Sequence, residues 1–543
     1  MNGEFAVVLH SHLPYVRGAG RWPHGEEWVH EAILGTYLPL LVALHDLRDQ
    51  RVPFRLSIGL TPTLLAQLAD ADISLRFMEY AEDQIRRASV DASDSASAGH
   101  GARGLLSVGY RDRYTELFAA YRDRFGRDLP GAFGALARTG HLEILWSAAT
   151  HGYLPLLDDD SIEAQLATGR LSSERILGVA PGGGFWLPEC AYRPGLERAL
   201  ERNGIRHFIV DPALVAGRRA FPRALQRPQF GRSGGGLSTA ASEPRFAHEH
   251  PLSSGAADPL VPHLVGDSRV VAVARHSEIS GQVWSAAAGY PGDQAYREFH
   301  RKDARSGLRY WRVSGPGVGL GEKLDYDPAA AARRVAVHAE HFMRSVCELL
   351  DARRDPGLVT AAFDTELFGH WWYEGVDWLT LVLKGMAARG RPATTLARYL
   401  EARPPTTRVE LAEGSWGADN DHSTWANPRV DWMHEETAAM AGSLRRITGV
   451  PAGDALRRRA TQVALRELLL AEASDWPFLI TTNQATDYAA ERFRVHAGRF
   501  TRALELAQWG AAGDEAELRV LEGVAPVFDG VLRGFSAAEP VAG

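Results

Sequence analysis

Two acidic residues of this chain directly follow apolar segments of strand length. Glu189 follows Gly184–Pro188, Asp364 follows Val359–Phe363, and aromatic residues flank both acids. Two carboxyl groups across one pocket are the arrangement of a glycosidase, in which one acid attacks the anomeric carbon and the other protonates the leaving oxygen. A retaining mechanism needs them about 5–5.5 Å apart, with the pKa of the proton donor raised by its surroundings. The alternatives are a solvated loop position for Glu189 and a helix N-cap for Asp364.

Three histidines follow two other apolar segments. His10 and His12 come directly after Phe5–Leu9, and His151 follows Leu142–Trp146. Residues two apart in an extended chain point to the same side, so both imidazoles of the first motif face one way. A His-x-His motif is also typical of a metal site in a barrel hydrolase or deacetylase, and that alternative stays open on the motif alone. A single histidine such as His151 is more often a structural hydrogen-bonding group.

These four segments belong to a longer alternation of strands and helices. Such alternation predicts a parallel sheet with right-handed crossovers. Its length favours a closed barrel with insertions, in which catalytic groups lie at the carboxyl ends of the strands. The seven predicted strands are Phe5–Leu9, Phe54–Leu60, Leu142–Trp146, Gly184–Pro188, His207–Val210, Val270–Ala274 and Val359–Phe363.

The regions outside these strands have a different texture. Ala88–Gly104 is rich in Ser, Ala, Asp and Gly and predicts a linker, whereas Gln229–Asp258 predicts a lid or a disordered loop. Beyond Arg403-Pro404-Pro405 the pattern becomes helical. The predicted helices there are Asp431–Ile447, Asp454–Ala473 and Ala489–Trp509.

Composition narrows the function classes. Of the 543 residues, 45% are hydrophobic and 23% charged, which excludes a fibrous or disordered chain. The net charge of -7 argues against nucleic-acid binding. The two cysteines do not form a metal-type motif, and we find neither a signal peptide nor a run of about 18 apolar residues. We therefore expect a cytoplasmic protein that does not bind membranes. The 14 tryptophans add a carbohydrate site to the hypotheses, because indole faces stack on sugar rings.

With these motifs in order, the chain resembles glycoside hydrolase family 57 and, within it, the 1,4-α-glucan branching enzymes. The similarity extends to Ser474–Phe478 and so covers nearly the whole chain. Single blocks carry little weight, whereas five in the same order are specific. The matching blocks are His10–Tyr15, Thr150–Pro155, Trp186–Tyr192, Phe363–Trp371 and Glu413–Gly417.

The resemblance implies an α/β fold with three parts. Residues 1–90 and 140–400 would form a catalytic (β/α)7 barrel, and residues 91–139 a helical insertion. Residues 401–543 would form an all-α C-terminal domain that contributes to the glucan cleft.

The resemblance also implies roles for particular residues. Glu189 stands at the family's nucleophile position and Asp364 at its general acid/base position. No metal and no cofactor are expected, which would make the histidines sugar-binding groups. The implied substrate-binding residues are His10, His12, His151, Arg275, Trp284, Gly292, Trp416, Asp475, Trp476 and Gln484.

One departure concerns the lid. Branching enzymes of this family carry a tyrosine on a loop over the site, thought to keep water from the covalent intermediate. This chain has no tyrosine between Tyr192 and Tyr290. Residues that could replace it are Phe230, Phe246, His248 and His250. A weaker lid would shift the reaction towards hydrolysis, because lids of this kind exclude water.

The expected activity is therefore retaining transfer of an α-1,4-glucan segment to a 6-hydroxyl, by a monomer acting on an amylose- or glycogen-like polysaccharide. A 4-α-glucanotransferase or an α-1,4-glucan hydrolase is the nearest alternative. A metal-dependent barrel hydrolase or a non-catalytic glucan-binding protein is more distant.

Overall fold

Seven parallel strands form one closed barrel. The computed structural model describes residues 3–20, 23–97, 99, 101–180, 182–217, 257–285, 289–448 and 455–532. The barrel strands are β1 (Gly3–Ser11), β2 (Leu56–Leu60), β3 (Leu142–Leu145), β4 (Gly184–Phe185), β5 (His207–Val210), β7 (Val271–Ala274) and β8 (Gly357–Asp364). Each coincides with a predicted strand, and the expected α/β barrel is confirmed.

The barrel strands form two hydrogen-bonded sheets, and backbone contacts between their edges at two places close the ring. β1 pairs in parallel with β2 and β8, β2 with β3, and β5 with β4 and β7. A parallel bridge between Trp146 and Phe185 joins β3 to β4. The His276 N–H, just after β7, donates to the Thr360 oxygen of β8 at 2.8 Å. The strands therefore follow the cyclic order β1-β2-β3-β4-β5-β7-β8.

The interior of the barrel and its outer layer are both apolar, which is why the strand sequences are continuously hydrophobic. Ala6, Val8, Leu145, Ile209 and Val273 belong to one cluster with Trp186 at the mouth. Two short strands outside the ring, β6 (His263–Val265) and β9 (Arg408–Val409), were not predicted. β6 pairs antiparallel with β7 and parallel with β9.

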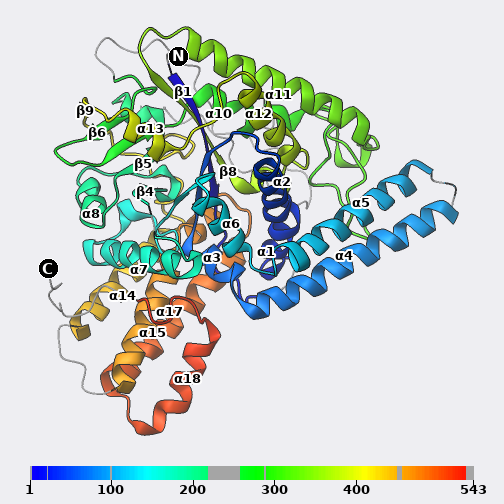
Figure 1. The fold of residues 1–543 in the computed structure, drawn as a ribbon. Helices are drawn as coiled ribbons and strands as arrows, with labels where there is room; N and C mark the ends of the chain where they lie inside the picture. The colour runs from blue at the N-terminus through cyan, green and yellow to red at the C-terminus, as the bar shows by residue number, and fades with distance from the viewer. Residues whose placement is uncertain are drawn as a thin grey trace.

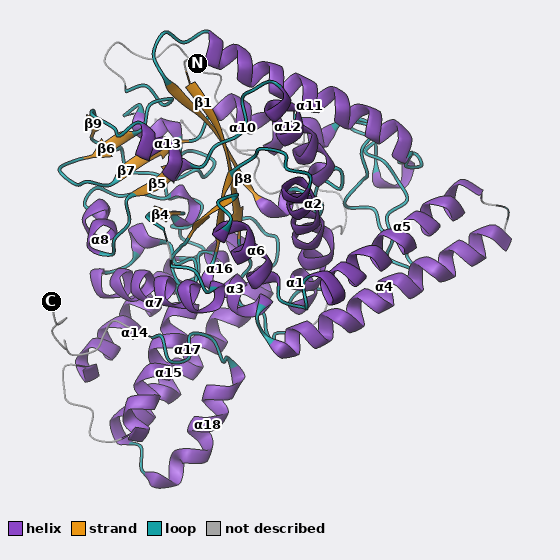
Figure 2. Ribbon diagram, viewed as in Figure 1, coloured by secondary structure: helices purple, strands orange, loops and turns teal. Residues whose placement is uncertain are grey.

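Helices surround the barrel (Figures 1 and 2). Thr61 is the N-cap of α3, with Pro62 first in the helix as its sequence predicts. The helices up to the last barrel strand's crossover are α1 (Glu26–Ala32), α2 (Leu38–Asp49), α3 (Pro62–Leu68), α4 (Ala71–Ser97), α5 (Gly101–Ala119), α6 (Leu129–Arg138), α7 (Asp159–Leu177), α8 (Leu196–Arg202), α9 (Pro212–Val215), α10 (Ser277–Trp284), α11 (Pro328–Asp351), α12 (Gly375–Ala388) and α13 (Leu396–Ala402).

The linker predicted at Ala88–Gly104 is wrong. α4 continues to Ser97 and α5 begins at Gly101, and the two form a long antiparallel arm that leaves the barrel (Figure 1). Ala is the best helix former, and small residues let two helices approach closely. A Cβ on Gly104 would lie 3.4 Å from the Cβ of Ser95 on the partner helix. Composition suggested a linker where the small residues serve packing. We propose that residues 91–139 belong to the helical insertion, and α4, which begins at Ala71, extends it towards the barrel.

The C-terminal part is helical, as its sequence predicts. It contains α14 (Asp431–Thr448), α15 (Ala455–Ala471), α16 (Asp475–Thr481), α17 (Thr486–Trp509) and α18 (Glu515–Val524), which pack around one apolar core below α7 (Figure 1). An antiparallel bridge between Gly152 and Ala473 attaches this part to the loop after β3. That bridge places the start of α16 beside His151.

Candidate active site

The carboxyl ends of the barrel strands bring the predicted acids and histidines to one mouth. His10 and Asp364 are register partners on the adjacent strands β1 and β8. The ring of Trp186, just after β4, stacks on the ring of His10 with centroids 4.3 Å apart. Glu189 acts electrostatically on Asp364, and its negative charge is one of the causes that raise the pKa of Asp364. Residues more than 350 positions apart in the chain thus share one site.

The backbone at Glu189 adopts a conformation that non-glycine residues rarely use. Glu189 has φ +60°, the next residue Cys190 has φ +49°, and His151 has φ +57°. Backbone strain of this kind clusters at functional sites and persists only where surrounding contacts hold it. Here the Trp416 N–H donates to the Glu189 backbone oxygen at 3.1 Å, and the Ser474 N–H donates to the His151 oxygen at 3.1 Å.

The Glu189 carboxylate accepts two side-chain hydrogen bonds. Trp416 Nε1 donates to Oε2 at 2.9 Å, and Ser474 Oγ donates to Oε1 at 2.9 Å. The side chain is 15% exposed. Burial raises the pKa of Glu189 to about 7, although both hydrogen bonds act to lower it. The group can therefore be ionised near neutral pH while it remains buried.

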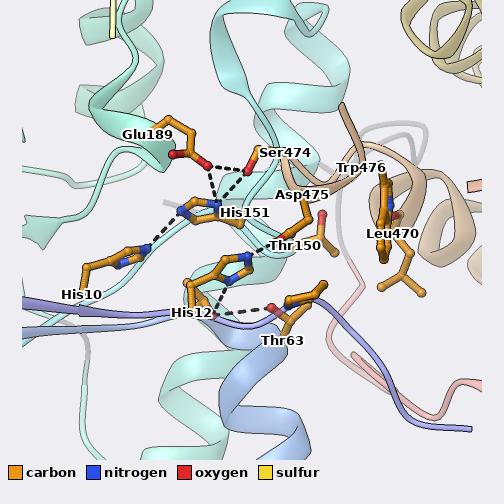
Figure 3. A network of polar contacts seen from close by, with 12 residues as sticks. His10, His12, Thr63, Thr150, His151, Glu189, Leu470, Ser474, Asp475 and Trp476 are labelled. Atoms are coloured by element: carbon orange, nitrogen blue, oxygen red, sulfur yellow. Dashed lines mark hydrogen bonds and ion pairs between the residues drawn. The ribbon is translucent and has the colours of Figure 1, made fainter. Parts of the chain in front are cut away.

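Two neutral histidines complete a chain of hydrogen bonds to Glu189 (Figure 3). His151 Nδ1 lies 2.8 Å from Ser474 Oγ, and His151 Nε2 lies 3.1 Å from His10 Nε2. Burial lowers the pKa of both imidazoles well below its usual value. Because the Ser474 hydroxyl donates to Glu189, its oxygen accepts from His151 Nδ1–H, and His151 Nε2 then accepts from His10 Nε2–H. This assignment leaves His10 Nδ1 as a bare lone pair, and His10 Nδ1 is indeed among the buried side-chain atoms of the described residues that have no hydrogen-bond partner. Every proton in the chain points towards Glu189.

His12 has a different electrostatic role. Its Nδ1 bonds Thr61 Oγ1 at 3.0 Å and its Nε2 bonds Asp475 Oδ2 at 2.9 Å. Burial acts to lower the pKa of His12, but the charges of Asp475 and Glu189 raise it above its usual value. His12 therefore tends to carry a proton, and its ring stacks on that of His151 with centroids 4.0 Å apart.

Asp364 lies in the opposite kind of environment. It occupies the N-cap position of the 3-10 helix Thr365–Leu367, yet its side chain makes no capping hydrogen bond. Burial, followed by the charges of Glu366 and Glu189, raises the pKa of Asp364 well above its usual value. Its carboxyl group thus keeps its proton to a higher pH than an ordinary aspartic acid does. Glu366 beside it bonds the Tyr37 hydroxyl, and burial raises the pKa of Glu366 to about 7.

Three other predicted contact residues lie near Glu189. Arg275 holds Asp211 through two hydrogen bonds of 3.0 and 2.8 Å, and its guanidinium lies 5.4 Å from the Trp416 ring. The Trp284 ring meets the edge of Trp416, with centroids 5.7 Å apart. Trp416 therefore contacts Glu189 through its indole N–H, and Trp284 and Arg275 through its ring.

Two predicted contact residues lie outside this hydrogen-bonded network. Gly292 ends the short 3-10 helix Tyr290–Gly292. Gln484 lies in the turn between α16 and α17, where its N–H donates to Leu479 O at 3.1 Å.

Trp476 does not suit the role of a glucan contact. Its side chain is completely buried in the core of the C-terminal helices, and its Nε1 donates to Leu470 O at 2.9 Å. Figure 3 shows the indole pointing away from Glu189. A buried ring cannot stack on a sugar, so Trp476 supports the helix that carries Asp475.

Several functional residues were missed from sequence. Ser474 lies next to Asp475 in a recognised block, so its position was available, but its contact with Glu189 is tertiary. Thr61 was predicted only as a helix cap, and its hydroxyl instead bonds His12. Glu366 lies two residues beyond Asp364, and its partner Tyr37 comes from a distant segment.

Among the described residues, no group of three or more His, Cys, Asp or Glu side chains is arranged to hold a metal ion. In the same part of the chain, no helix combines the length and apolar character needed to cross a membrane. Nearly all of the expected lid, including Phe230, Phe246, His248 and His250, lies outside the described residues, which stop at 217 and resume at 257.

Comparison with known proteins agrees with this geometry. The family model for glycosyl hydrolase family 57 matches residues 6–393, and a model for the C-terminal part of 1,4-alpha-glucan branching enzymes matches residues 433–532. The chain is 40% identical to a 1,4-alpha-glucan branching enzyme of Thermococcus kodakarensis, covering 96% of this chain and 76% of the relative.

Solved structures of related enzymes are similar to the chain over nearly its whole length. A crystal structure of the Thermococcus enzyme in complex with glucose has a TM-score of 0.87 at 38% identity, covering 99% of this chain and 97% of that one. The alpha-amylase AmyC of Thermotoga maritima has a TM-score of 0.81 at 28% identity, covering 98% of each chain.

Proposed function

The chain belongs to glycosyl hydrolase family 57, and from this premise we propose that it is a 1,4-α-glucan branching enzyme. It cleaves an α-1,4 bond in a linear glucan and transfers the released segment to a 6-hydroxyl, which creates an α-1,6 branch. The match of the helical part to the branching-enzyme C-terminal model supports this function over other activities of the family.

The reaction proceeds by double displacement. A Glu189 carboxylate oxygen forms a bond to C1 of the donor sugar as the C1–O4 bond breaks, and Asp364 gives its proton to O4. The ionised Asp364 then takes the proton from the acceptor 6-hydroxyl. The acceptor oxygen bonds C1, Glu189 leaves as a carboxylate, and Asp364 is protonated again. The first step needs Glu189 ionised and Asp364 protonated, and the second needs Asp364 ionised while Glu189 is bonded to C1.

The contrast between the two acids carries the proposal. Glu189 accepts hydrogen bonds from Trp416 and Ser474, which favour its ionised form. Asp364 accepts none from the described residues, and burial raises its pKa. Burial raises the pKa of both acids, but only Glu189 receives hydrogen bonds that favour its ionised form, and this difference matches the roles of nucleophile and acid.

The C-terminal helices complete the cleft. Ser474 and Asp475 reach Glu189 and His12, and Trp416 comes from the connection between the barrel and these helices. His10, His12, His151, Arg275, Trp284 and Asp475 then surround the donor sugar, with Gly292 and Gln484 as more distant glucan contacts.

Variants of the two acids test the proposal on amylose. Glu189→Gln should reduce branching to background, because amide oxygen does not displace the leaving group. Asp364→Asn should lower it by about 10²–10⁴-fold, the usual contribution of a general acid. New branches are measured by sizing the chains released by isoamylase, and hydrolysis by free reducing ends.

Glu374→Gln is the matched control. Glu374 is also buried with a raised pKa, but it accepts from Tyr326 Oη at 2.6 Å and from the Arg297 N–H at 3.1 Å, and not from the groups that bond Glu189. This variant should keep the branching rate. Substantial branching by Glu189→Gln would refute the nucleophile assignment. Release of reducing ends without new branches by the unmodified protein would instead identify a hydrolase, as the similarity to the Thermotoga amylase allows.

A further inference from the structure

A second cavity, of about 330 Å³, lies outside the hydrogen-bonded network around Glu189. α1, the α4–α5 arm and the segment 297–309 form most of its wall, and Gly369, His370 and Tyr373 form the rest. Its lining contains six arginine and lysine side chains against three acidic ones. The cavity therefore has a surplus of positive charge, although the chain as a whole is negatively charged.

Half of these cations already have carboxylate partners. Lys302 lies 2.9 Å from Glu31, Arg305 lies 2.8 Å from Asp94, and Arg87 pairs with Asp83 at 2.5 Å. These three paired cations are the more exposed ones, with 41–67% of each side chain exposed. Among the described residues, the remaining three cations of the lining have no such ion pair.

The other three cations are Arg113, Arg297 and Arg309. In the described part of the chain, none of them lies within ion-pair distance of a carboxylate. Arg297 is only 8% exposed, and its guanidinium lies 3.7 Å from the centre of the Tyr373 ring. Arg113 lies 5.0 Å from the same ring, and Arg309 Nε donates to the Phe299 oxygen at 2.7 Å. A ring face holds these groups in position but does not replace a counter-charge.

Burying cations without an opposite charge is costly, and such groups normally have a partner. Burial lowers the pKa of the Arg309 guanidinium, the charge of Glu31 acts against this shift, and the charge of Arg297 adds to it. An anion between the three groups would remove this penalty. Guanidinium groups bind phosphate through paired, charge-assisted hydrogen bonds, which makes phosphate the best complement.

We propose that this cavity binds a small phosphate-bearing ligand, with Arg113, Arg297 and Arg309 holding the phosphate. Its volume lies at the lower end of the range for small-molecule sites and suits a phosphorylated sugar or a nucleotide. A neutral glucan would leave the three cations without a counter-charge.

Binding to the purified full-length protein tests the site. Inorganic phosphate, glucose 6-phosphate, adenosine diphosphate and maltotriose are titrated separately by calorimetry. We expect the phosphate-bearing probes to bind and maltotriose to leave the site unoccupied. A stronger response to glucose 6-phosphate identifies a sugar phosphate, and a stronger response to the diphosphate identifies a nucleotide.

Arg113→Gln and Arg309→Gln should each weaken binding about tenfold or more, as loss of a charge-assisted hydrogen bond predicts. Arg122→Gln, on the exposed side of the arm, is the control and should bind normally. Protection of Arg113 and Arg309 from phenylglyoxal in the unmodified protein, read by mass spectrometry, replaces the variants if they do not fold. Absence of binding and protection at millimolar phosphate or sugar phosphate would overturn the proposal.

Discussion

Ser474, between the C-terminal helices α15 and α16, forms hydrogen bonds with two residues of the barrel loops, His151 and Glu189. Its hydroxyl accepts from His151 and donates to Glu189, while its backbone N–H fixes the strained loop at His151. The hydroxyl therefore both orients the nucleophile and favours its ionised form. Ser474 acts through Glu189, so it is a positioning residue.

Replacing Ser474 by alanine should change the pH dependence of branching. The hydrogen bond from Ser474 lowers the pKa of Glu189, which burial raises to about 7. Its loss raises that pKa by about one unit, the usual value of a charge-assisted hydrogen bond. Because Glu189 must be ionised, the acidic limb of the kcat/KM profile should move to higher pH.

Measurement of kcat/KM between pH 5 and pH 9 checks this expectation. Ser474→Thr keeps the hydroxyl and should restore the acidic limb. Ser107→Ala removes a buried hydroxyl from the α5 helix and should leave the profile unchanged. Equal loss of activity at every pH in Ser474→Ala would show that the residue acts only on structure.

At the scale of elements, the position of Ser474 depends on α15 and α17. Glu467 of α15 is completely buried, where it bonds Arg466 at 3.0 Å and His496 of α17 at 2.7 Å. Although burial acts to raise the pKa of Glu467, the hydrogen bond and charge of His496 lower it below its usual value. The Arg466–Glu467 ion pair and the Glu467–His496 hydrogen bond thus fix α15 against α17, just before the segment that carries Ser474 and Asp475.

Glu467→Ala should destabilise the protein by about 3–5 kcal/mol, the cost of leaving a buried charge unpaired. Urea unfolding followed by circular dichroism gives the change in the free energy of unfolding. Glu515→Ala, which breaks a pair with Arg459 at the surface, should destabilise the protein far less, because solvent screens such pairs. Equal stability of the two variants would mean that the buried network contributes little to the C-terminal helices.

Strands and helices could be predicted where their hydrophobic pattern was long and unambiguous. The barrel strands are apolar on both faces, so continuous hydrophobic segments located all seven of them. β6 and β9 are only three and two residues long, too short to leave a pattern. Ala88–Gly104 was misjudged because the same small residues suit a linker and a close helix pair.

At the scale of the whole molecule, the sequence predicted most residues of the candidate site but not the hydrogen bonds between them. The two acids and three histidines could be predicted because each follows an apolar strand segment and lies in one of the recognised motifs. The hydrogen bonds of Ser474 to Glu189 and of Asp475 to His12 join segments separated by more than 280 residues. The positive φ of Glu189 likewise depends on contacts from Trp416. Such contacts arise only when the barrel and the helices fold together.

Three buried carboxyl groups, among them the proposed nucleophile, should make stability fall as pH rises. Burial raises the pKa of Glu189, Glu366 and Glu472 from 4.5 to about 7. Between these values the folded state binds more protons than the unfolded state, so the free energy of unfolding decreases with increasing pH. Each acid contributes a decrease of about 3 kcal/mol by pH 8. The lowered pKa of about 2 of Glu31 and Glu298 acts in the opposite sense, below pH 4.5.

Glu189→Gln should therefore stabilise the protein at pH 8, by up to about 3 kcal/mol, and change it little at pH 5, where Glu189 is protonated in the folded state. Urea unfolding of both proteins at the two pH values measures the difference, with Glu340→Gln as an exposed control. A gain of the same size at both pH values would show that packing, and not the buried charge, is responsible. A gain confined to pH 8 would show that the ionised nucleophile is maintained against the stability of the fold, as expected where a site is selected for reactivity.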